Sequence, residues 1–340
     1  MARVVTFGEI MLRLAPEGHY RFVQAGSFGA TYGGAEANVA VSLANMGMEA
    51  AFVTKLPENE LGQAAVNGLR QFGVDVSGIV RGGQRIGIYF LEKGASQRPS
   101  KVIYDRSGSA IALAEVGDFD WQAIFAGASW FHVTGITPAL SDKAAEITMQ
   151  ALKAAKAKGI TVSCDLNYRK NLWSQEKAGR VMGELMPLVD FCMANEEDAA
   201  EVFGIRAKDS DVVLGSLSAE GYGEVARALV DRFGFKDVAF TLRESANASE
   251  NGWAGMLYRG GRCHFSRKYA LRIVDRVGGG DSFAAGLIHS RLAGLSPEES
   301  VEFAAAASCL KHSVEGDFNQ VSLQEIRKLV DGDGSGRVQR

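Results

Sequence analysis

The sequence of 340 residues has little cysteine, only six prolines and no excess of charge of one sign. Its four cysteines (Cys164, Cys192, Cys263 and Cys309) stand far apart and form no Cys-x-x-Cys pair. This spacing argues against both a disulfide framework and a zinc site. The 37 basic and 40 acidic residues are intermixed, giving a formal net charge of −3. Because no basic field is available to displace phosphate counterions, nucleic acid is not expected as a partner.

Long apolar runs are also missing. No stretch of 18 uninterrupted apolar residues is present, so neither a transmembrane helix nor a membrane partner is predicted. The apolar residues Val4–Phe7 are followed closely by Glu9 and Arg13 and are too few for a secretory signal. We therefore expect the protein in the reducing environment of the cytoplasm.

The chain does contain an alternation of short apolar or β-branched runs with longer helical patterns. This alternation predicts an α/β fold in which a doubly wound, mostly parallel sheet carries helices on both faces. In such sheets ligands bind beyond the carboxyl ends of the strands. Strands are predicted at Arg3–Phe7, Ala51–Thr54, Trp130–Thr134, Thr161–Cys164, Phe191–Ala194 and Val238–Leu242. Helices are predicted at Ala35–Met46, Glu60–Gln71, Asp142–Ala157, Gln175–Met186, Gly223–Phe233, Ser282–Ala293 and Pro297–Lys311.

Two segments interrupt this alternation. Residues 12–32 are rich in glycine and aromatic residues without a helical period, and residues 86–91 and 101–104 resemble two strands joined by a polar connection. Together they predict a small sheet that covers a site on the main sheet. The predicted division is a main domain of residues 1–12, 33–85 and 107–330, a β-lid of residues 13–32 and 86–106, and a disordered tail of residues 331–340.

The most informative stretch runs from Asp275 to Gly286 and contains the glycines Gly278–Gly280. These glycines precede an apolar helix that we expect to begin near Ser282. Glycines leave successive N–H groups unobstructed, and at a helix N-terminus such groups form an anion site. Asp281 would lie beside the anion and could take a proton from an attacking hydroxyl. On the residues alone, Asp281 could equally be a helix cap and the glycines a plain loop.

A second glycine pair, Gly33-Gly34, opens the predicted helix that contains Asn38. An amide one turn inside an apolar helix is unfavourable unless it meets a partner or a ligand. The partner could be a ligand in the site, or Asn38 could be a satisfied core residue.

Together these two stretches resemble the signatures Gly-Gly-x-x-x-Asn and Gly-x-Gly-Asp of the PfkB, or ribokinase-like, carbohydrate kinases, and the resemblance covers about residues 3–330. It implies the ribokinase-like fold with a small β-lid. It also implies sugar contacts from Gly33, Gly34 and Asn38, an anion hole at Gly278, Gly279 and Gly280, and Asp281 as the catalytic base.

Further positions are similar to the branch of that family that phosphorylates 2-keto-3-deoxygluconate, a sugar acid. They are the segments Gly8–Arg13, Tyr104–Arg106, Asp165–Arg169 and Gly316-Asp317. In that branch tyrosine and arginine side chains hold the acid, because a guanidinium matches a carboxylate in two places. The resemblance implies substrate contacts from Tyr89, Tyr104, Arg106, Arg169 and Asp317. Without the resemblance, Arg106 and Arg169 would be read as solvated or as paired with Asp105 and Asp165.

The resemblance also implies ATP and Mg²⁺ as cofactors, with a monovalent cation as a further candidate. Asn195–Asp198 stands where the family carries an Asn-x-x-Glu motif near the magnesium, and Asp198 is one methylene shorter. Asp198, Glu197 or water could therefore fill that role, and no other metal ligand is predicted. Relatives carry a compact glycine turn where this chain has Arg243–Gly252, which leaves the nucleotide specificity open. The expected nucleotide contacts are Asn167, Asn195, Asp198, Arg243 and Ser308.

The predicted reaction is ATP-dependent phosphorylation of 2-keto-3-deoxy-D-gluconate at O6. Alternatives within the family are a fructokinase, a ketohexonate kinase or a nucleoside kinase, and an alternative outside it is a non-catalytic sugar- or nucleotide-binding protein. A small sheet with open edges invites pairing, so we expect a homodimer formed through the lid.

Overall fold

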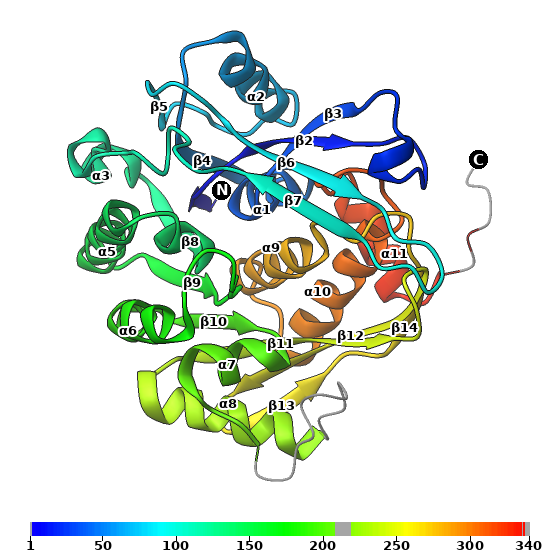
Figure 1. The fold of residues 1–340 in the computed structure, drawn as a ribbon. Coiled ribbons are helices and arrows are strands. Elements are labelled where there is room, and N and C mark those ends of the chain that lie inside the picture. The colour runs from blue at the N-terminus through cyan, green and yellow to red at the C-terminus, as the bar shows by residue number, and fades with distance from the viewer. Residues whose placement is uncertain (1, 208–218, 335, 337–340) are drawn as a thin grey trace.

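The structure is a computed structural model that describes residues 2–207, 219–334 and 336. Its main sheet has the strand order β13-β12-β11-β10-β9-β8-β1-β4-β5, and β14 also pairs with β12 (Figure 1). The parallel strands are β1 (Arg3–Phe7), β4 (Glu49–Leu56), β5 (Ile79–Arg81), β8 (Ala128–Thr134), β9 (Thr161–Asp165), β10 (Phe191–Ala194) and β11 (Asp237–Ser245). The antiparallel strands are β12 (Glu250–Arg259), β13 (Arg262–Phe265) and β14 (Tyr269–Arg272).

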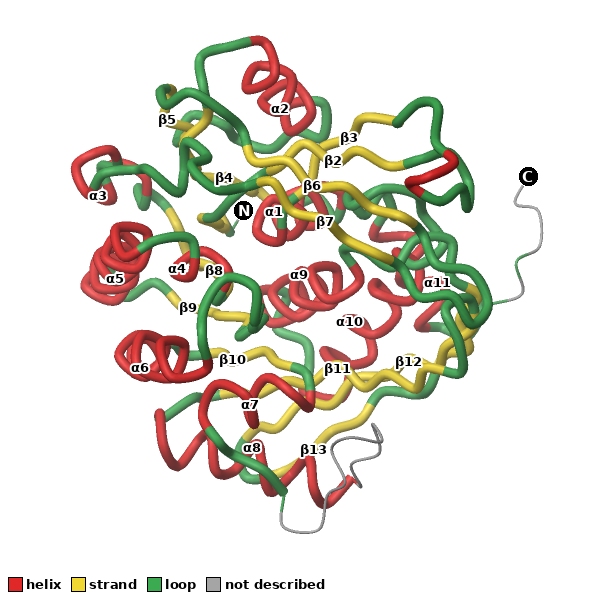
Figure 2. The backbone as a smooth tube through the Cα atoms, in the orientation of Figure 1, coloured by secondary structure: helices red, strands yellow, loops and turns green. Residues whose placement is uncertain are grey.

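Helices cover both faces of this sheet (Figure 2). One layer contains α1 (Ala35–Asn45), α2 (Glu60–Arg70), α9 (Gly279–Leu292), α10 (Pro297–Lys311) and α11 (Leu323–Val330). The other contains α3 (Trp121–Ile124), α4 (Ile136–Ala139), α5 (Asp142–Ala157), α6 (Gln175–Leu185), α7 (Glu196–Phe203) and α8 (Ala219–Phe233). Short 3₁₀ helices occur at Phe22–Gln24, Val116–Asp118 and Met186–Leu188.

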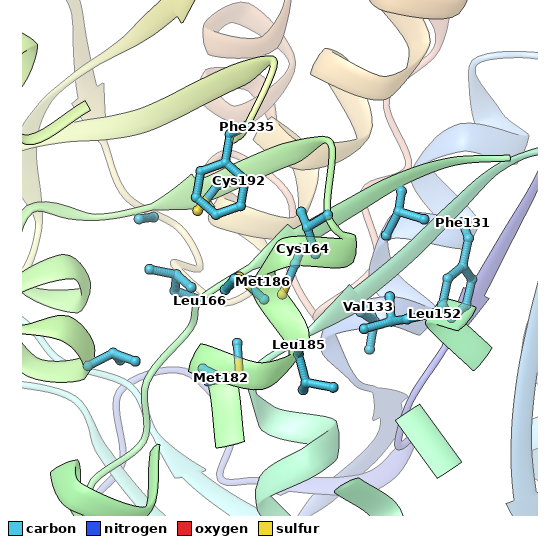
Figure 3. Close-up of a cluster of buried hydrophobic side chains, with 14 of the residues drawn as sticks. Phe131, Val133, Leu152, Cys164, Leu166, Met182, Leu185, Met186, Cys192 and Phe235 are labelled. Carbon is cyan, nitrogen blue, oxygen red and sulfur yellow. The ribbon is translucent and has the colours of Figure 1, made fainter. Parts of the chain in front are cut away.

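The two helical layers exist because successive strand residues point to opposite faces. In β8, Phe131 and Val133 join the core beneath α5 and α6, whereas Trp130 joins the core beneath α9 and α10. Figure 3 shows part of the first core, where Cys164 and Cys192 lie among the apolar side chains. Strands buried on both faces read as nearly continuous apolar runs, which is why the sequence predicted them.

Chain order locates the crevice of the sheet. From β1 the chain moves through β4 to β5 on one side, and it returns to build β8, β9, β10 and β11 on the other. Strand order therefore reverses between β1 and β8, and ligands bind at such a point beyond the carboxyl ends of the strands. The predicted α/β class, the mostly parallel sheet and every predicted strand and helix are confirmed.

A separate four-stranded sheet lies across this crevice (Figure 1). Its order is β3-β2-β6-β7, with β2 (Met11–Ala15), β3 (Gly29–Gly33), β6 (Gly87–Glu92) and β7 (Lys101–Asp105). The antiparallel β6–β7 pair is the one expected at residues 86–91 and 101–104. The predicted boundary between residues 12 and 13 falls inside β2, because this strand begins at Met11.

Two local expectations were wrong. Helix α9 begins at Gly279 rather than near Ser282, because Gly278 in a left-handed conformation (φ 83°) ends the turn and lets two glycines enter the first helical turn. Strand β11 was predicted to end at Leu242, but it continues through Arg243 to Ser245 and pairs with β12, so residues 243–252 largely form a hairpin. The alternation of apolar and polar residues did not predict that residues 241–245 pair with residues 251–255.

Within the described residues no helix is long and apolar enough to cross a membrane. All four cysteines are free thiols. Of the tail predicted at residues 331–340, residues 335 and 337–340 lie outside the described part of the chain.

Candidate active site

A cavity of about 1410 Å³ opens at the carboxyl ends of the parallel strands, between the N-terminus of α9 and the small sheet. Pockets for one small ligand usually measure about 300–1,000 Å³, so this cavity has room for two substrates side by side. Residues that follow β1, β9 and β10, together with Arg243 of β11, line its floor. Tyr89 and Tyr104 of the small sheet line it from the opposite side. All site residues predicted from the sequence line this cavity except Gly33 and Ser308.

The glycine turn at the start of α9 forms one wall of the cavity. A Cβ atom on Gly278 would overlap the carbonyl oxygen of Asp317, and one on Gly279 would overlap the ring of His312. On Gly280, by contrast, a Cβ atom would have no protein atom within 4 Å. Gly278 and Gly279 are therefore required by packing, whereas Gly280 leaves free space at a helix N-terminus, where an anion binds favourably.

Asp281 stands in the first turn of α9, but its carboxylate caps no N–H group of the helix. Instead it accepts a hydrogen bond of 2.6 Å from Asn38 Nδ2 and remains partly exposed to the cavity. Burial raises the pKa of Asp281 to about 7; the Asn38 hydrogen bond opposes this rise, and Glu36 and Asp317 add to it. A carboxyl group that titrates near neutral pH is well matched to general base catalysis.

The Gly33-Gly34 pair brings α1 close to this aspartate. A Cβ atom on Gly33 would overlap the Asp317 carboxylate, and one on Gly34 would overlap the carbonyl oxygen of Glu9. Asn38 accepts a hydrogen bond of 3.3 Å from Gly34 N and donates to Asp281. The polar residue that stood out in an apolar helix is thus bonded to the candidate base, and its predicted sugar contact stays a prediction.

Further carboxyl groups surround the floor. Burial, followed by the charges of Asp198 and Asp281, raises the pKa of Asp165 well above its usual value. Burial also raises the pKa of Asp198 to about 6, although both of its oxygens accept backbone N–H groups, from Tyr168 and Asn195. Among the described residues no group of three His, Cys, Asp or Glu side chains has metal-binding geometry.

Cationic side chains gather on the other side of the glycine turn. The Arg243 guanidinium lies 5.1 Å from the centre of the Trp253 ring, and half-buried Arg276 donates to the Ala248 carbonyl at 3.2 Å. Burial lowers the pKa of His312 to about 4, and the charges of Arg243, Lys311 and Arg276 lower it further. Because the His312 ring backs Gly279, these three cations surround the glycine turn.

Ser308 lies behind the turn rather than on the cavity surface. Its hydroxyl is fully buried and donates a hydrogen bond of 2.6 Å to the Gly279 carbonyl oxygen. The position of Ser308 therefore does not support the expected contact with the nucleotide. It supports a role in holding Gly279 in place.

The half of the cavity under the small sheet contains both predicted arginines. Arg106 is buried and paired with Glu9, not with Asp105, through Nε at 2.8 Å and through Nη2. Arg169 is exposed, and the only acceptor found for it in the described chain is the Tyr168 carbonyl, at 2.9 Å from Nη1. Asn167, which carries a positive φ of 38°, also lines this region.

Asp317 and Tyr89 contact one another. The Tyr89 hydroxyl donates to Asp317 Oδ2 at 2.5 Å, and Arg13 donates to Asp317 Oδ1 at 2.8 Å. Arg13 also donates to Asp275 at 2.5 Å, and so connects β2 with the segment before the glycine turn.

Several residues of the site received no individual role from the sequence, namely Glu9, Arg13, Glu36, Asp165, Asp275, Arg276 and Lys311, although all of these except Glu36 and Lys311 lie in segments that the sequence singled out. Arg13 and Glu36 share one signal, a charge among the mostly apolar residues of a strand or helix. Lys311 gave no such signal, because it is the last residue of a helix that also contains Glu298, Glu299 and Glu302. A buried charge in such a place needs a partner. Arg13 pairs with Asp317, which lines the cavity, and Glu36, which lines the cavity itself, accepts hydrogen bonds from Thr134 and Thr137.

Comparison with known proteins adds a family and several relatives. Residues 1–322 match the family described as pfkB family carbohydrate kinase. The chain is 33% identical to the 2-dehydro-3-deoxygalactonokinase of Haloferax volcanii, over 98% of both chains. It is 28% identical to the 2-dehydro-3-deoxygluconokinase of Bacillus subtilis, over 94% of this chain and 93% of the other. The crystal structure of 2-dehydro-3-deoxygluconokinase from Thermotoga maritima superposes with a TM-score of 0.94 at 54% identity, covering 97% and 98% of the two chains.

Proposed function

Because the chain belongs to the PfkB family of carbohydrate kinases, we propose that it transfers a phosphoryl group from ATP to O6 of 2-keto-3-deoxy-D-gluconate, also called 2-dehydro-3-deoxygluconate. The observation that carries the proposal is the position of Asp281, which shares one cavity with the open face of Gly280 and with Arg169. The activities of the relatives from Bacillus subtilis and Thermotoga maritima support the choice of sugar acid.

The glycine turn binds the phosphoryl group that is transferred. The N-terminus of α9 adjoins the free space beside Gly280, while Arg243 and Arg276 add positive charge. Phosphoryl transfer needs this kind of fixed positive environment, because charge on the phosphate oxygens must be neutralised as the bond to the leaving group breaks.

Asp281 accepts the proton of the O6 hydroxyl and orients that oxygen toward the phosphoryl group. Its hydrogen bond from Asn38 leaves one carboxylate oxygen for the substrate. With a pKa of about 7, Asp281 is ionised in a large part of the molecules near neutral pH and is still basic enough to accept the proton.

The cavity also fits ATP and Mg²⁺. Arg243 and Arg276 lie where phosphates beyond the glycine turn would extend, and Trp253 provides an apolar surface beneath Arg243. Burial and the charges of Asp198 and Asp281 disfavour the ionised form of Asp165, and a cation would stabilise it, which suits Asp165 to Mg²⁺. Asp198 would reach the ion through water, since backbone N–H groups occupy both of its oxygens. When bound, Mg²⁺ neutralises phosphate charge.

Arg169 binds the carboxylate of the sugar acid. Nε and Nη2 of Arg106 donate to Glu9, whereas Arg169 lies on the cavity surface, and within the described residues only its Nη1 donates to a protein acceptor. Arg106 then positions Tyr104, over whose ring its guanidinium lies at 5.4 Å, and Tyr104 packs against Tyr89. The small sheet acts as a lid that excludes water from the sugar and so limits ATP hydrolysis.

The test is ADP release by purified protein with Mg-ATP and a panel of 2-keto-3-deoxygluconate, its C4 epimer 2-keto-3-deoxygalactonate, gluconate, fructose, ribose and a nucleoside. Selectivity for 2-keto-3-deoxygluconate is expected. Preference for the C4 epimer would move the assignment toward the activity of the Haloferax volcanii relative. Activity with fructose or ribose alone would reject the acid-sugar pocket, and a protein that binds sugar without releasing ADP would reject the kinase reaction.

The variant Arg169→Met tests the arginine separately. Losing a charge-assisted contact to a buried carboxylate should lower kcat/KM for the acid sugar by about 10²-fold. Turnover of any neutral sugar should change little, and equal losses with acid and neutral sugars would remove Arg169 from the carboxylate site.

A further inference from the structure

Lys311, the last residue of α10, is among the largest fully buried side chains of the described chain, with 0% of its surface exposed. Lysine is almost never buried completely unless it is paired, because removing an ammonium group from water is costly. Neither the glycine turn nor Asp281 needs Lys311 as a direct ligand, so its burial calls for another explanation.

Lys311 lies directly behind the glycine turn. A Cβ atom on Gly278 would be 3.2 Å from Lys311 Cε, and Lys311 Nζ donates a hydrogen bond of 3.1 Å to the Val314 carbonyl oxygen. That single neutral acceptor satisfies one of the three ammonium donors. The Lys311 side chain therefore lies beneath the glycine turn, and this hydrogen bond uses only one of the donors of its ammonium group.

The charges around Lys311 form a small buried cluster. Arg13 bridges Asp275 and Asp317, with distances of 2.5 and 2.8 Å. Burial lowers the pKa of Lys311, and the charges of Asp275 and Asp317 oppose that effect. Half-buried Arg276 also interacts with Asp275, and Asp281 interacts with Lys311. The three cations Arg13, Lys311 and Arg276 thus balance three carboxylates, and the cluster is neutral only while Lys311 is charged.

We propose that Lys311 is a positioning residue of the phosphate site, whose charge keeps the cluster beneath the glycine turn neutral and so permits polyphosphate to bind there. Without this charge, one carboxylate charge would be left uncompensated behind Gly278 and would repel the phosphates. The repulsion would be strong because the cluster is shielded from water. The inference rests on the proposed function, since it assigns the turn to phosphate.

The main test is Lys311→Met, which keeps the length and apolar stem of the side chain but removes its charge. Binding of ATP, ADP and adenosine is measured by calorimetry without sugar, and kcat and KM are measured with the best sugar of the panel. We expect the dissociation constants of ATP and ADP to rise at least tenfold and that of adenosine to change less than twofold. The matched control is Lys153→Met on the exposed face of α5, which should leave all three unchanged.

A second variant distinguishes charge from packing. Asp317→Asn removes one negative charge while its amide can still donate to the Tyr89 hydroxyl and its carbonyl can accept from Arg13. Combined with Lys311→Met it restores neutrality, so the double variant should regain at least half of the lost ATP affinity on a logarithmic scale. Asp317→Asn alone should not weaken ATP binding, and this prediction remains testable if Lys311→Met does not fold.

Three results would overturn the proposal. They are unchanged ATP affinity in Lys311→Met, equal weakening of adenosine and ATP, and no recovery in a folded double variant. Because nucleotide binding is measured without sugar, these results are independent of the panel. If no sugar of the panel is phosphorylated but the binding pattern holds, the substrate assignment fails and the role of Lys311 stands.

Discussion

At the scale of single residues, Asp281 lines the cavity and lies close to other acidic side chains. Burial and the charges of Glu36 and Asp317 disfavour its ionised form, while the amide of Asn38 favours it. The candidate base is therefore held between two opposing influences, and its pKa depends on which of them is changed.

The first prediction concerns this balance. Asp281→Asn should lower turnover about 10²–10⁴-fold while sugar binding is kept. In the wild-type protein, kcat/KM should rise with pH through an apparent pKa near 7, because the base works only when deprotonated. Asn38→Ala removes a hydrogen bond to the charged form and should move this rise to higher pH by about one unit. The measurement is a pH profile of kcat/KM between pH 5 and 9.

The control for this profile is Asn45→Ala on the same helix, whose amide donates to the Asn319 carbonyl outside the cavity. It should leave the apparent pKa unchanged. A shift to lower pH in Asn38→Ala, or near-normal turnover in Asp281→Asn, would contradict the role of Asp281 as the base.

The same aspartate should also reduce stability at high pH. Its pKa in the folded protein is raised above the value in the unfolded chain, so the stability that it contributes is present at low pH and is lost as the pH rises through about 7. Asp281→Asn should consequently raise Tm more at pH 8 than at pH 5. An equal effect at both pH values would mean that the carboxyl group is not buried in the manner described.

Sequence reasoning found the residues whose type is unusual for their place. Asn38 in an apolar helix and Asp281 after three glycines could both be singled out in this way. It could not find that Arg106 pairs with Glu9, since 97 residues separate them and only the fold brings them together. Asp105, the nearest acid in the sequence, binds Arg85 instead.

At the scale of elements, the N-terminus of α9 shows why three adjacent glycines are not equivalent. Two of them make room for Asp317 and His312, and the third faces open space. In such a run of glycines, packing requires glycine at two positions, whereas at the third the free space suits a ligand. The sequence does not distinguish these positions, but the structure does.

This difference leads to a second prediction. Gly280→Ala should fold normally, because its added methyl group meets no protein atom, and it should gain up to about 0.5–1 kcal/mol in the free energy of unfolding. The methyl group would enter the space assigned to the phosphoryl group, so kcat/KM should fall by at least about 10-fold. The matched control is Gly68→Ala in α2, which also meets no atom and should gain stability with full activity.

Gly279→Ala should show the opposite combination, with a loss of stability because its methyl group would overlap the His312 ring. Thermal unfolding and steady-state kinetics on the three variants check the prediction. Full activity in Gly280→Ala would place the phosphoryl group elsewhere.

Helices with a clear hydrophobic period could be predicted from the sequence, whereas strands that depend on pairing with a neighbouring strand could not. The helices α5 and α10 follow from long periodic segments with serine caps at Ser141 and Ser296. The β11–β12 hairpin was missed because most of its residues from Arg243 to Glu250 are polar and none of them is buried, so they show no apolar strand pattern. The start of α9 was misplaced because glycine has low helix propensity, which packing against α10 overrides here.

At the scale of the whole molecule, the sheet topology could be predicted from alternation, but the position of the small sheet relative to α9 could not. That position is fixed by buried contacts between distant segments, above all Arg13 with Asp275 and Asp317. These contacts link β2 to the phosphate side of the cavity, so closure of the small sheet and the geometry of the glycine turn are expected to depend on one another.

The small sheet also has two edge strands, β3 and β7, without a further hydrogen-bonded neighbour in the described chain. All residues of β7 are exposed, and Ile103 exposes 55% of its surface. Val102 and Tyr104 line the cavity, whereas Ile103 does not, in keeping with the alternation of side chains along a strand. Exposed edges bearing apolar side chains favour pairing with another chain, and we propose a homodimer formed by the small sheets.

The third prediction follows from this arrangement. Ile103→Lys should weaken the dimer at least about tenfold in dissociation constant, because it places a charge in the apolar contact and charged edge residues prevent strand pairing. Sedimentation velocity over a range of concentrations measures this change. The matched control is Leu113→Lys, since Leu113 is 62% exposed but lies outside the small sheet and should leave the dimer intact. A wild-type protein that is monomeric at all concentrations, or an equal effect of both variants, would show that the edges of the small sheet do not form the contact.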